Sequence, residues 1–395
     1  MRRWMWTAVT VLVVLSVVSG PTELAEAGPV TPAAEWTQEG YGPGNTSYNP
    51  DESTINATSI GRLRQRWTVT TPHTADLCNS QSPPLVKAGR LYTTDPTGIV
   101  SYAATTGRRL WHWTLPHIDP TRKNQEHFGV LAAAGNLLVA LTNPCEYGVG
   151  QSAYLTGLDA ATGRQRWRVR MDQYTNIMVV DKGVAAVGNW GGFDGGPHTT
   201  TGYRVTDGAR LWSTTGYRLN FPVSAGGRLL LSRADDKAAR AVSILNGRSL
   251  WNTAKPWSPQ AASPAGDRFL VSTAGDGVTS VDAATGRPQW TTGHHGAIAD
   301  DGRTVYLTYH RAVEAFDART GRLLRTMPLG KRGGTRPVRA GGLIYLTVTA
   351  YNAMEILSPL TGKHVGAPAI RGGPPVIVNG WLYTTDGETL HAYAP

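Results

Sequence analysis

One ten-residue stretch recurs along the whole chain, and its recurrence limits the folds that the chain can adopt. Residues 281–290, Val-Asp-Ala-Ala-Thr-Gly-Arg-Pro-Gln-Trp, read as a strand end, a tight Asp…Thr-Gly turn and a strand that carries one large aromatic side chain. Close copies occur at residues 158–167 and 316–322, and looser copies at residues 102–111, 205–212, 245–251 and 357–363. A unit that recurs in this way indicates the architecture of a chain but not its activity.

The segments between these turns repeat one strand pattern. Each unit has a short apolar strand, a turn that contains glycine, a second strand, a third strand that leads into the Asp…Thr-Gly turn, and a fourth strand that carries the Trp. Second strands recur at residues 89–94, 135–141, 183–187, 227–232, 267–273, 303–308, 342–347 and 380–384. The turn glycines lie 35 to 56 residues apart. This spacing is typical of four-stranded propeller blades, whereas helical repeats would show a period of about 3.6 residues.

The residue types of the turn have physical reasons. An Asp side chain can accept hydrogen bonds from backbone N–H groups ahead of it, and Gly adopts the positive φ that such a turn needs. The Trp buries a large area and can fill the space between neighbouring blades. The structural repeat residues that we predict are Trp111, Trp167, Trp212, Trp251, Trp290, Gly107, Gly163, Gly286 and Gly321. Arg325 and Val365 stand where Trp would fall in the sixth and seventh units, so we expect those units to pack less tightly there.

The two ends of the repeat array complement each other. The eighth unit, residues 374–393, has three strands, and the chain stops before a fourth. Residues 62–69 alternate like a fourth strand, yet no repeat precedes them. If this strand completes the last unit, the ring closes and the exposed edge of the last unit is covered. The sequence therefore predicts an all-β protein: an eight-bladed β-propeller of four-stranded antiparallel blades, with seven blades as the alternative.

The chain begins with the features of an export signal. Arg2 and Arg3 precede an apolar run over residues 4–18, and Ala25-Glu26-Ala27 is a small-x-small cleavage site. The run is shorter than the ~20 residues that span a bilayer, although a retained anchor is the alternative. We expect residues 1–27 to be a signal peptide, residues 28–61 an N-terminal extended leader and residues 62–395 the propeller. The protein is then secreted or extracytoplasmic.

The chain is basic, with a formal net charge of +10. A basic surface favours anionic partners such as an acidic cell-surface polymer or a membrane face, and general solubility is the alternative explanation. Nucleic acid is disfavoured as a partner because export removes the usual target. Arginines alternate over residues 62–66 and 164–170, where charge on outer strands discourages strand pairing. We expect a monomer.

Two cysteines, Cys78 and Cys145, are far apart in the sequence. In an oxidising compartment an isolated pair usually forms a disulfide. We therefore predict a bridge between them, which would stabilise the chain by ~2–4 kcal/mol. Two free thiols are the alternative.

Long loops gather on one predicted face. In a propeller, the loops from second to third strands and from fourth strands to the next blade share a face, and they are long at residues 70–83, 115–127, 142–152, 188–200 and 252–264. Variable loops on a rigid scaffold often carry function. We expect a protein or small-molecule ligand to bind there. The candidate ligand-binding residues are His117, Asp119, Asn143, Trp190, Phe193, Asp194, His198, His294 and His310. No close metal-ligand motif accompanies these imidazoles and carboxylates, so we predict no metal site.

The stretch Ala283-Ala284-Thr285-Gly286-Arg287-Pro288-Gln289-Trp290, repeated as above, resembles the tryptophan-docking repeat of the PQQ-like, or quinoprotein-like, β-propellers. The resemblance covers residues 62–395, and residues 44–50 resemble the entry segment of exported bacterial members. It implies a family that includes quinone-dependent alcohol and sugar dehydrogenases, scaffold propellers of outer-membrane protein assembly, and sensor domains. For the dehydrogenases it implies an adjacent-cysteine disulfide ring and a calcium-binding carboxylate set. This chain has no adjacent cysteines, and none of its residues can be assigned to such a set.

Two functions follow as hypotheses. The first is an exported, non-catalytic binding or scaffold propeller that uses the long-loop face and needs no cofactor. The alternative is a quinone-dependent oxidoreductase of alcohols or sugars that uses PQQ with calcium. The sequence nominates no catalytic residues, because it has no Gly-x-Ser-x-Gly elbow, phosphate-binding loop or Cys-x-x-Cys motif.

Overall fold

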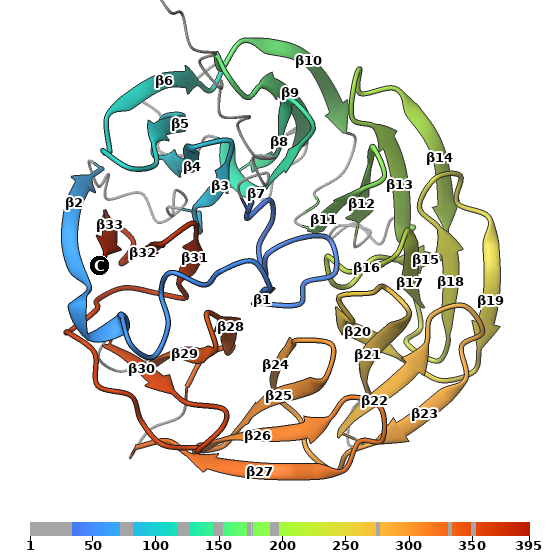
Figure 1. Cartoon of the computed structure of the whole chain (residues 1–395). Helices are drawn as coiled ribbons and strands as arrows, with labels where there is room; N and C mark the ends of the chain where they lie inside the picture. Colours follow the sequence, from blue (N-terminus) through green and yellow to red (C-terminus); the bar gives the residue numbers. More distant parts are fainter. Residues whose placement is uncertain are drawn as a thin grey trace, which may run out of the picture. The chain divides into compact units, whose positions relative to one another are not determined.

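Eight small β-sheets surround a central axis in the computed structural model (Figure 1). The structure describes residues 34–71, 82–116, 126–144, 153–171, 175, 177–189, 197–273, 277–330, 334–348 and 353–395. The arrangement confirms the eight-bladed propeller, and the eight second strands fall where the sequence predicts them. No helix in these residues has the length and hydrophobicity needed to cross a bilayer.

Each blade is built outward from a strand at the axis. The innermost strands are β3 (Leu85–Lys87), β7 (Glu126–Ala134), β11 (Ile177–Asp181), β16 (Ser224–Ala225), β20 (Ser258–Ala262), β24 (Ala297–Asp300), β28 (Val338–Ala340) and β31 (Val376–Val378). The second strands are β4 (Arg90–Asp95), β8 (Leu137–Pro144), β12 (Val184–Asn189), β17 (Arg228–Arg233), β21 (Arg268–Thr273), β25 (Thr304–Tyr309), β29 (Leu343–Val348) and β32 (Trp381–Thr385).

The outer half of each blade follows the same order. The third strands are β5 (Gly98–Ala103), β9 (Ala153–Asp159), β13 (Thr199–Arg204), β18 (Ala239–Ser243), β22 (Gly277–Asp282), β26 (Ala312–Asp317), β30 (Ala353–Leu357) and β33 (Thr389–Ala394). The outermost strands are β6 (Arg109–Thr114), β10 (Gln165–Met171), β14 (Arg210–Thr215), β19 (Ser249–Thr253), β23 (Pro288–Thr291), β27 (Leu323–Pro328) and, in blade eight, β2 (Arg64–Thr70).

Blades four and seven depart from this plan. In blade four, the short strand β15 (Tyr217–Arg218) pairs with β17 beside β16. In blade seven, the fourth strand of the sheet is β1 (Tyr48–Asn49), which pairs in parallel with β28 at the axis. The outer position of blade seven holds an isolated bridge between Leu357 and His364.

The two ends of the array meet in blade eight, as the sequence predicts. Strand β2 pairs antiparallel with β33, with Gln65 opposite Tyr393 and Val69 opposite Leu390. The last blade therefore takes its outer strand from the beginning of the array, and the ring closes.

Tryptophans link successive blades. Each indole N–H donates to a backbone carbonyl in the next blade, over distances of 2.7–3.1 Å. The pairs are Trp67 with Ala104, Trp111 with Ala160, Trp167 with Val205, Trp212 with Ile244, Trp251 with Ala283, and Trp290 with Ala318. In blade six Arg325 takes this place, because its side chain packs against Gly362 and its Nη1 donates to the Thr361 carbonyl at 3.2 Å.

The Asp of the repeated turn accepts hydrogen bonds within the turn. Asp282 Oδ1 accepts from the Thr285 hydroxyl at 2.7 Å and from the Thr285 and Ala284 N–H groups at 2.8 and 3.1 Å. The hydroxyl bond is the largest of the effects that hold the pKa of Asp282 below its ordinary value. The turn is thus ordered by contacts within a few residues, which explains why its sequence repeats.

The leader expected over residues 28–61 is, from residue 34 onward, part of the packed structure. We call residues 36–49 the axial segment, since the chain in blue crosses the middle of the ring (Figure 1). It forms hydrogen bonds of 2.7–2.9 Å with the inner strand of every blade. The pairs, in blade order, are Trp36 with Val86, Thr37 with Ala133, Gln38 with Val180, Pro43 with Ser224, Gly44 with Ala262, Thr46 with Asp300, Ser47 with Arg339, and Asn49 with Ile377.

The chain after the axial segment is also anchored. The buried Glu52 carboxylate accepts hydrogen bonds from the N–H groups of Thr54, Ile55 and Gly380 at 2.8–3.0 Å. Ile55 is fully buried. The 3-10 helix η1 (Ile60–Arg62) then leads into β2, so the axial segment and the closing strand are consecutive.

The strand order defines two faces. We call the end with the turns from first to second and from third to fourth strands the turn face, and the other end the connection face. The axial segment contacts Asp300 and Ala262, the last residues of their inner strands. It therefore closes the axis at the turn face. The longer loops expected from the sequence belong to the connection face, at the opposite end of the axis.

Substitution of Gly321 and Gly89 by Ala distinguishes the cost of backbone strain from the cost of overpacking. Both have positive φ, +69° and +71°, but a Cβ on Gly321 would lie 2.7 Å from the Trp290 ring, whereas a Cβ on Gly89 would meet nothing within 4 Å. We expect Gly89→Ala to lower the free energy of unfolding by about 1 kcal/mol through backbone strain. Gly321→Ala should cost about 1–3 kcal/mol more through overpacking. Urea unfolding of both variants tests this, and equal losses would contradict a tight Trp contact.

Candidate functional site

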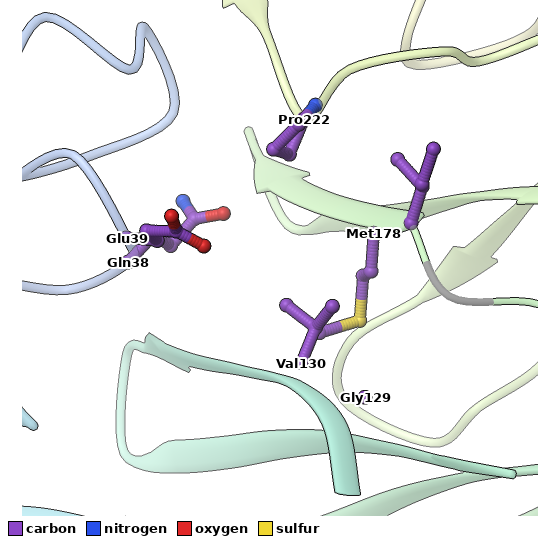
Figure 2. A pocket seen from close by; sticks show the side chains of 7 residues that line it. Gln38, Glu39, Gly129, Val130, Met178 and Pro222 are labelled. Atoms are coloured by element: carbon purple, nitrogen blue, oxygen red, sulfur yellow. The ribbon is translucent and has the colours of Figure 1, made fainter. Parts of the chain in front are cut away.

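A cavity of about 160 Å³ lies beside the axial segment (Figure 2). It is lined by Gln38, Glu39, Gly129, Val130, Ile177, Met178 and Pro222. Val130 precedes Ala133 on β7, and Met178 precedes Val180 on β11. Ala133 and Val180 are the residues that form hydrogen bonds with the axial segment. The cavity therefore lies on the connection-face side of the axial segment, which forms its floor.

The cavity combines an apolar wall with one carboxylate. Val130, Ile177, Met178 and Pro222 supply the wall, and Figure 2 shows Gln38 and Glu39 across the space from it. The Gln38 amide is already used, because its Nε2 donates to the Val180 carbonyl and its Oε1 accepts from the Val180 N–H. Glu39 is exposed and has no ion pair within the described part of the chain. The Glu39 carboxylate is thus available to a bound group.

Arg336 brings a positive charge to the same region. It precedes β28, and its Nη1 donates to Asn45 Oδ1 on the axial segment. Asn45 in turn donates from Nδ2 to the Gln260 carbonyl at 2.9 Å. Burial lowers the pKa of Arg336, and the negative charge of Glu39 opposes that shift. The axis therefore holds charges of both signs above the axial segment.

Asp300 is the buried acid beneath the axial segment. Its side chain is completely buried, its N–H donates to the Thr46 carbonyl at 2.9 Å, and its Oδ1 accepts from Gly302 N–H at 2.7 Å. Arg268 Nη2 lies 3.6 Å from Oδ2. Burial raises the pKa of the Asp300 carboxyl to about 6, against the smaller opposing effects of the Gly302 bond and the Arg268 charge.

Two of the predicted ligand residues come together on the connection face. His294 lies before β24, and His310 follows β25 with a φ of 49°. The His294 ring stacks on Tyr309 with centroids 4.3 Å apart, and Tyr309 is 4.1 Å from the His310 ring. His294 Nδ1 also pairs with the buried Glu314 carboxylate. The result is a surface cluster of two imidazoles and a phenol over one buried acid.

The other predicted residues with a described position lie in different blades. Asn143 is fully buried in blade two, where Oδ1 accepts from Thr175 N–H at 3.0 Å and Nδ2 has no partner among the described residues. His198, before β13, is half-buried, and its Nδ1 has no partner in the part of the chain that the structure describes. Among the hydrogen bonds and ring contacts of the described residues, none joins either side chain to His294 or His310. Their ligand-binding roles stay predictions.

Several predicted positions fall outside the described residues. These are His117, Asp119, Trp190, Phe193, Asp194 and both cysteines, Cys78 and Cys145. Within the ranges that are described, no group of three or more His, Cys, Asp or Glu side chains is placed to hold a metal ion.

Sequence reasoning missed Gln38, Glu39, Asp300, Glu314 and Arg336. Gln38 and Glu39 stand in a stretch with no hydrophobic periodicity, so nothing in the sequence places them at the axis. Asp300 was detectable in principle, because it ends an apolar inner strand and is followed by Asp301-Gly302 in a tight turn.

The raised pKa of the Asp300 carboxyl predicts that the stability of the fold depends on pH. The pKa of Asp300 in the folded state, about 6, exceeds the ordinary Asp value of 3.8, so the folded state binds more protons between these pH values, and stability falls as pH rises through them. A rise of this size corresponds to about 3 kcal/mol. We expect wild type to lose about that much more free energy of unfolding between pH 4 and 7 than Asp300→Asn does. Urea titrations at both pH values measure it, and identical pH profiles would contradict the raised pKa.

Comparisons with known proteins agree with this architecture. The family model described as outer membrane protein assembly factor BamB matches residues 151–293 and 235–366. Together these matches span 216 residues, more than half of the chain of 395. No curated protein matches the chain.

Solved structures show the same fold at low sequence identity. BamB from Moraxella catarrhalis is 17% identical with a TM-score of 0.60, over 84% of this chain and 98% of that chain. A europium-containing methanol dehydrogenase is 13% identical with a TM-score of 0.63, over 92% and 98% of the two chains. Quinohemoprotein alcohol dehydrogenase from Comamonas testosteroni is 13% identical with a TM-score of 0.64, over 91% and 80%.

Sequence identities this low indicate a shared fold and do not indicate a shared activity. The repeated turn, the docked tryptophans, the closed eight-bladed ring and the extent of the family match all point the same way. The chain belongs to the PQQ-like β-propeller repeat family.

Proposed function

We propose that this protein is an extracytoplasmic binding or scaffold propeller that holds a partner on its connection face. The observation that carries the proposal is the asymmetry of the axis. The axial segment is bonded to all eight blades and closes the turn face, while the cavity beside it lies toward the connection face. A rigid ring with one accessible end suits recognition, because the loops at that end can vary without disturbing the blades.

The cavity suits a small group with an apolar body and a positive end. Its volume of about 160 Å³ is below the roughly 300–1,000 Å³ of sites that enclose a whole small molecule. An apolar side chain would be buried against Val130, Ile177, Met178 and Pro222, and a cation would find Glu39 at the floor. A Lys or Arg side chain from a partner protein has this chemistry, since its stem is apolar and its head is charged.

A quinone-dependent oxidoreductase is the alternative, favoured by the similarity in fold to two dehydrogenases. PQQ with calcium would be its cofactor. PQQ is a polyanion, whereas Glu39 is the only charged one of the described residues that line the cavity, and the nearby Arg336 already donates to Asn45. The described residues also lack a metal-binding group of three or more acidic, His or Cys side chains. These residues do not fit the cofactor pair, so no catalytic step is derived through it.

An extracytoplasmic location accords with the apolar run after Arg2 and Arg3, and with the outer-membrane role in the matched family's description. In that location the proposed disulfide between Cys78 and Cys145 could form.

Site-specific cross-linking tests the proposal. A benzophenone amino acid would replace Pro222 or His310 on the connection-face side, and Gln165, exposed on the outer strand β10, would be the control. We expect a discrete protein adduct at Pro222 and His310 in the native host, none at Gln165, and a weaker Pro222 adduct when Glu39→Arg is added. Equal labelling at Gln165, or no adduct at either test position, would contradict the proposal.

A parallel assay tests the alternative. Dye-linked oxidation of alcohols and sugars is measured after PQQ and calcium are added to the purified chain. Turnover would favour the oxidoreductase, and we expect none above the rate without protein.

A further inference from the structure

The turn face carries positive charge at one repeated position. In seven blades a basic residue follows the glycine of the turn from third to fourth strand by one or two places. We call these residues the turn-face cations: Arg108, Arg164, Arg210, Arg248, Arg287, Arg322 and Lys363. All seven are exposed. Because the turn recurs once per blade at the outer end of the sheet, the cations are distributed around the margin of one face.

Within the described residues, the turn-face cations have no partner of opposite charge in an ion pair. None of the seven forms an ion pair with any described residue, whereas Arg166, Arg204 and Arg233 pair with Asp159, Asp207 and Asp235. Four aspartates share these turns, but each accepts hydrogen bonds from the backbone N–H groups of its own turn. They are Asp159, Asp207, Asp282 and Asp317. The margin therefore has an excess of positive charge that is free to meet an external anion.

Exposed leucines accompany these cations. The six exposed large apolar side chains of the described residues are Leu211, Leu245, Leu250, Leu323, Leu324 and Leu360. All lie either in a turn from third to fourth strand or at the first two positions of an outer strand. Leu245 and Leu360, in the turns of blades four and seven, are 51% and 84% exposed and stand three residues before Arg248 and Lys363. The apolar and cationic groups thus reach solvent side by side on one face.

This combination identifies the kind of partner. A soluble polyanion would need the cations alone and would gain nothing from leucines at the tips of the turns. A lipid bilayer offers both anionic phosphates and an apolar layer directly beneath them, and basic amphipathic surfaces bind there. We propose that the turn face docks on an anionic membrane surface, with the turn-face cations at the lipid phosphates and Leu245 and Leu360 in the acyl boundary. The connection face would then point away from the bilayer.

Vesicle co-sedimentation of the full chain tests this proposal. Vesicles of phosphatidylcholine with and without phosphatidylglycerol are compared, and we expect binding to the anionic vesicles that weakens with salt. The charge variant Arg248→Gln with Lys363→Gln should bind about thirtyfold more weakly, since each of the two basic residues near a charged membrane usually contributes about 1 kcal/mol. The leucine variant Leu245→Ser with Leu360→Ser should bind at least ~tenfold more weakly, from the loss of buried apolar area.

A matched control removes the same charge from the other face. Arg311 and Arg371 are exposed at the connection-face ends of blades six and eight, so Arg311→Gln with Arg371→Gln changes the net charge equally. We expect this variant to bind as wild type does. All variants have the same N-terminal residues, so a difference in vesicle binding between them comes from the substituted surface residues. Unfolding curves confirm that these substitutions leave the fold intact.

Three outcomes would overturn the proposal. One is an absence of wild-type binding to anionic vesicles. Another is equal loss of binding in the control and in the charge variant, which would indicate that net charge alone matters. The third is a leucine variant that binds as wild type while soluble polyphosphate competes fully, which would identify a polyanion as the partner instead.

Discussion

The hydrogen bonds between the axial segment and the eight inner strands are the constraint on which the rest of the structure depends. Inner strands of a propeller converge at the axis, where their last backbone N–H groups would face a narrow channel without partners. A buried N–H group left unpaired costs about 1–3 kcal/mol. Residues 36–49 supply carbonyl or side-chain partners to every blade, from Val86 in blade one to Ile377 in blade eight. The ring is therefore held together at its axis as well as at its outer seam, where β2 pairs with β33.

This hub makes the two faces different in structure. At the turn face the axis is closed, the turns are short and ordered by their own hydrogen bonds, and the exposed groups are cations and leucines at the margin. On the connection-face side of the axial segment lies a cavity with an apolar wall and the Glu39 carboxylate. Recognition by loops and attachment through the opposite face can coexist, because no residue used in one argument is used in the other. Both arguments depend on a ring rigid enough to keep the faces apart.

The fold was largely predictable because its signal is local and repeated. The Asp…Thr-Gly turn, the positive-φ glycine and the docking Trp are set by contacts within one blade and its neighbour, so each copy reports the same geometry. Even the pairing of the strand around Trp67 with the last blade was predictable, because the eighth unit lacks a fourth strand. The axial segment was not predictable. Single residues of it form hydrogen bonds with successive inner strands, so its sequence shows no hydrophobic periodicity. Of the candidate site, the sequence placed His294 and His310 on one face, but it did not predict that both rings contact Tyr309. Nor did it predict Gln38, Glu39 and Arg336, because they meet only after the ring has closed.

Native-state hydrogen exchange at the axis tests the central claim most directly. The amides of Ala133, Ser224, Ala262, Asp300 and Arg339 donate to the axial segment from five different blades. If that segment holds the ring, these amides exchange only through global unfolding and share one free energy of opening. Separate and lower free energies for individual blades, with the rest of the ring still protected, would show that the blades are held without the hub and would contradict this account.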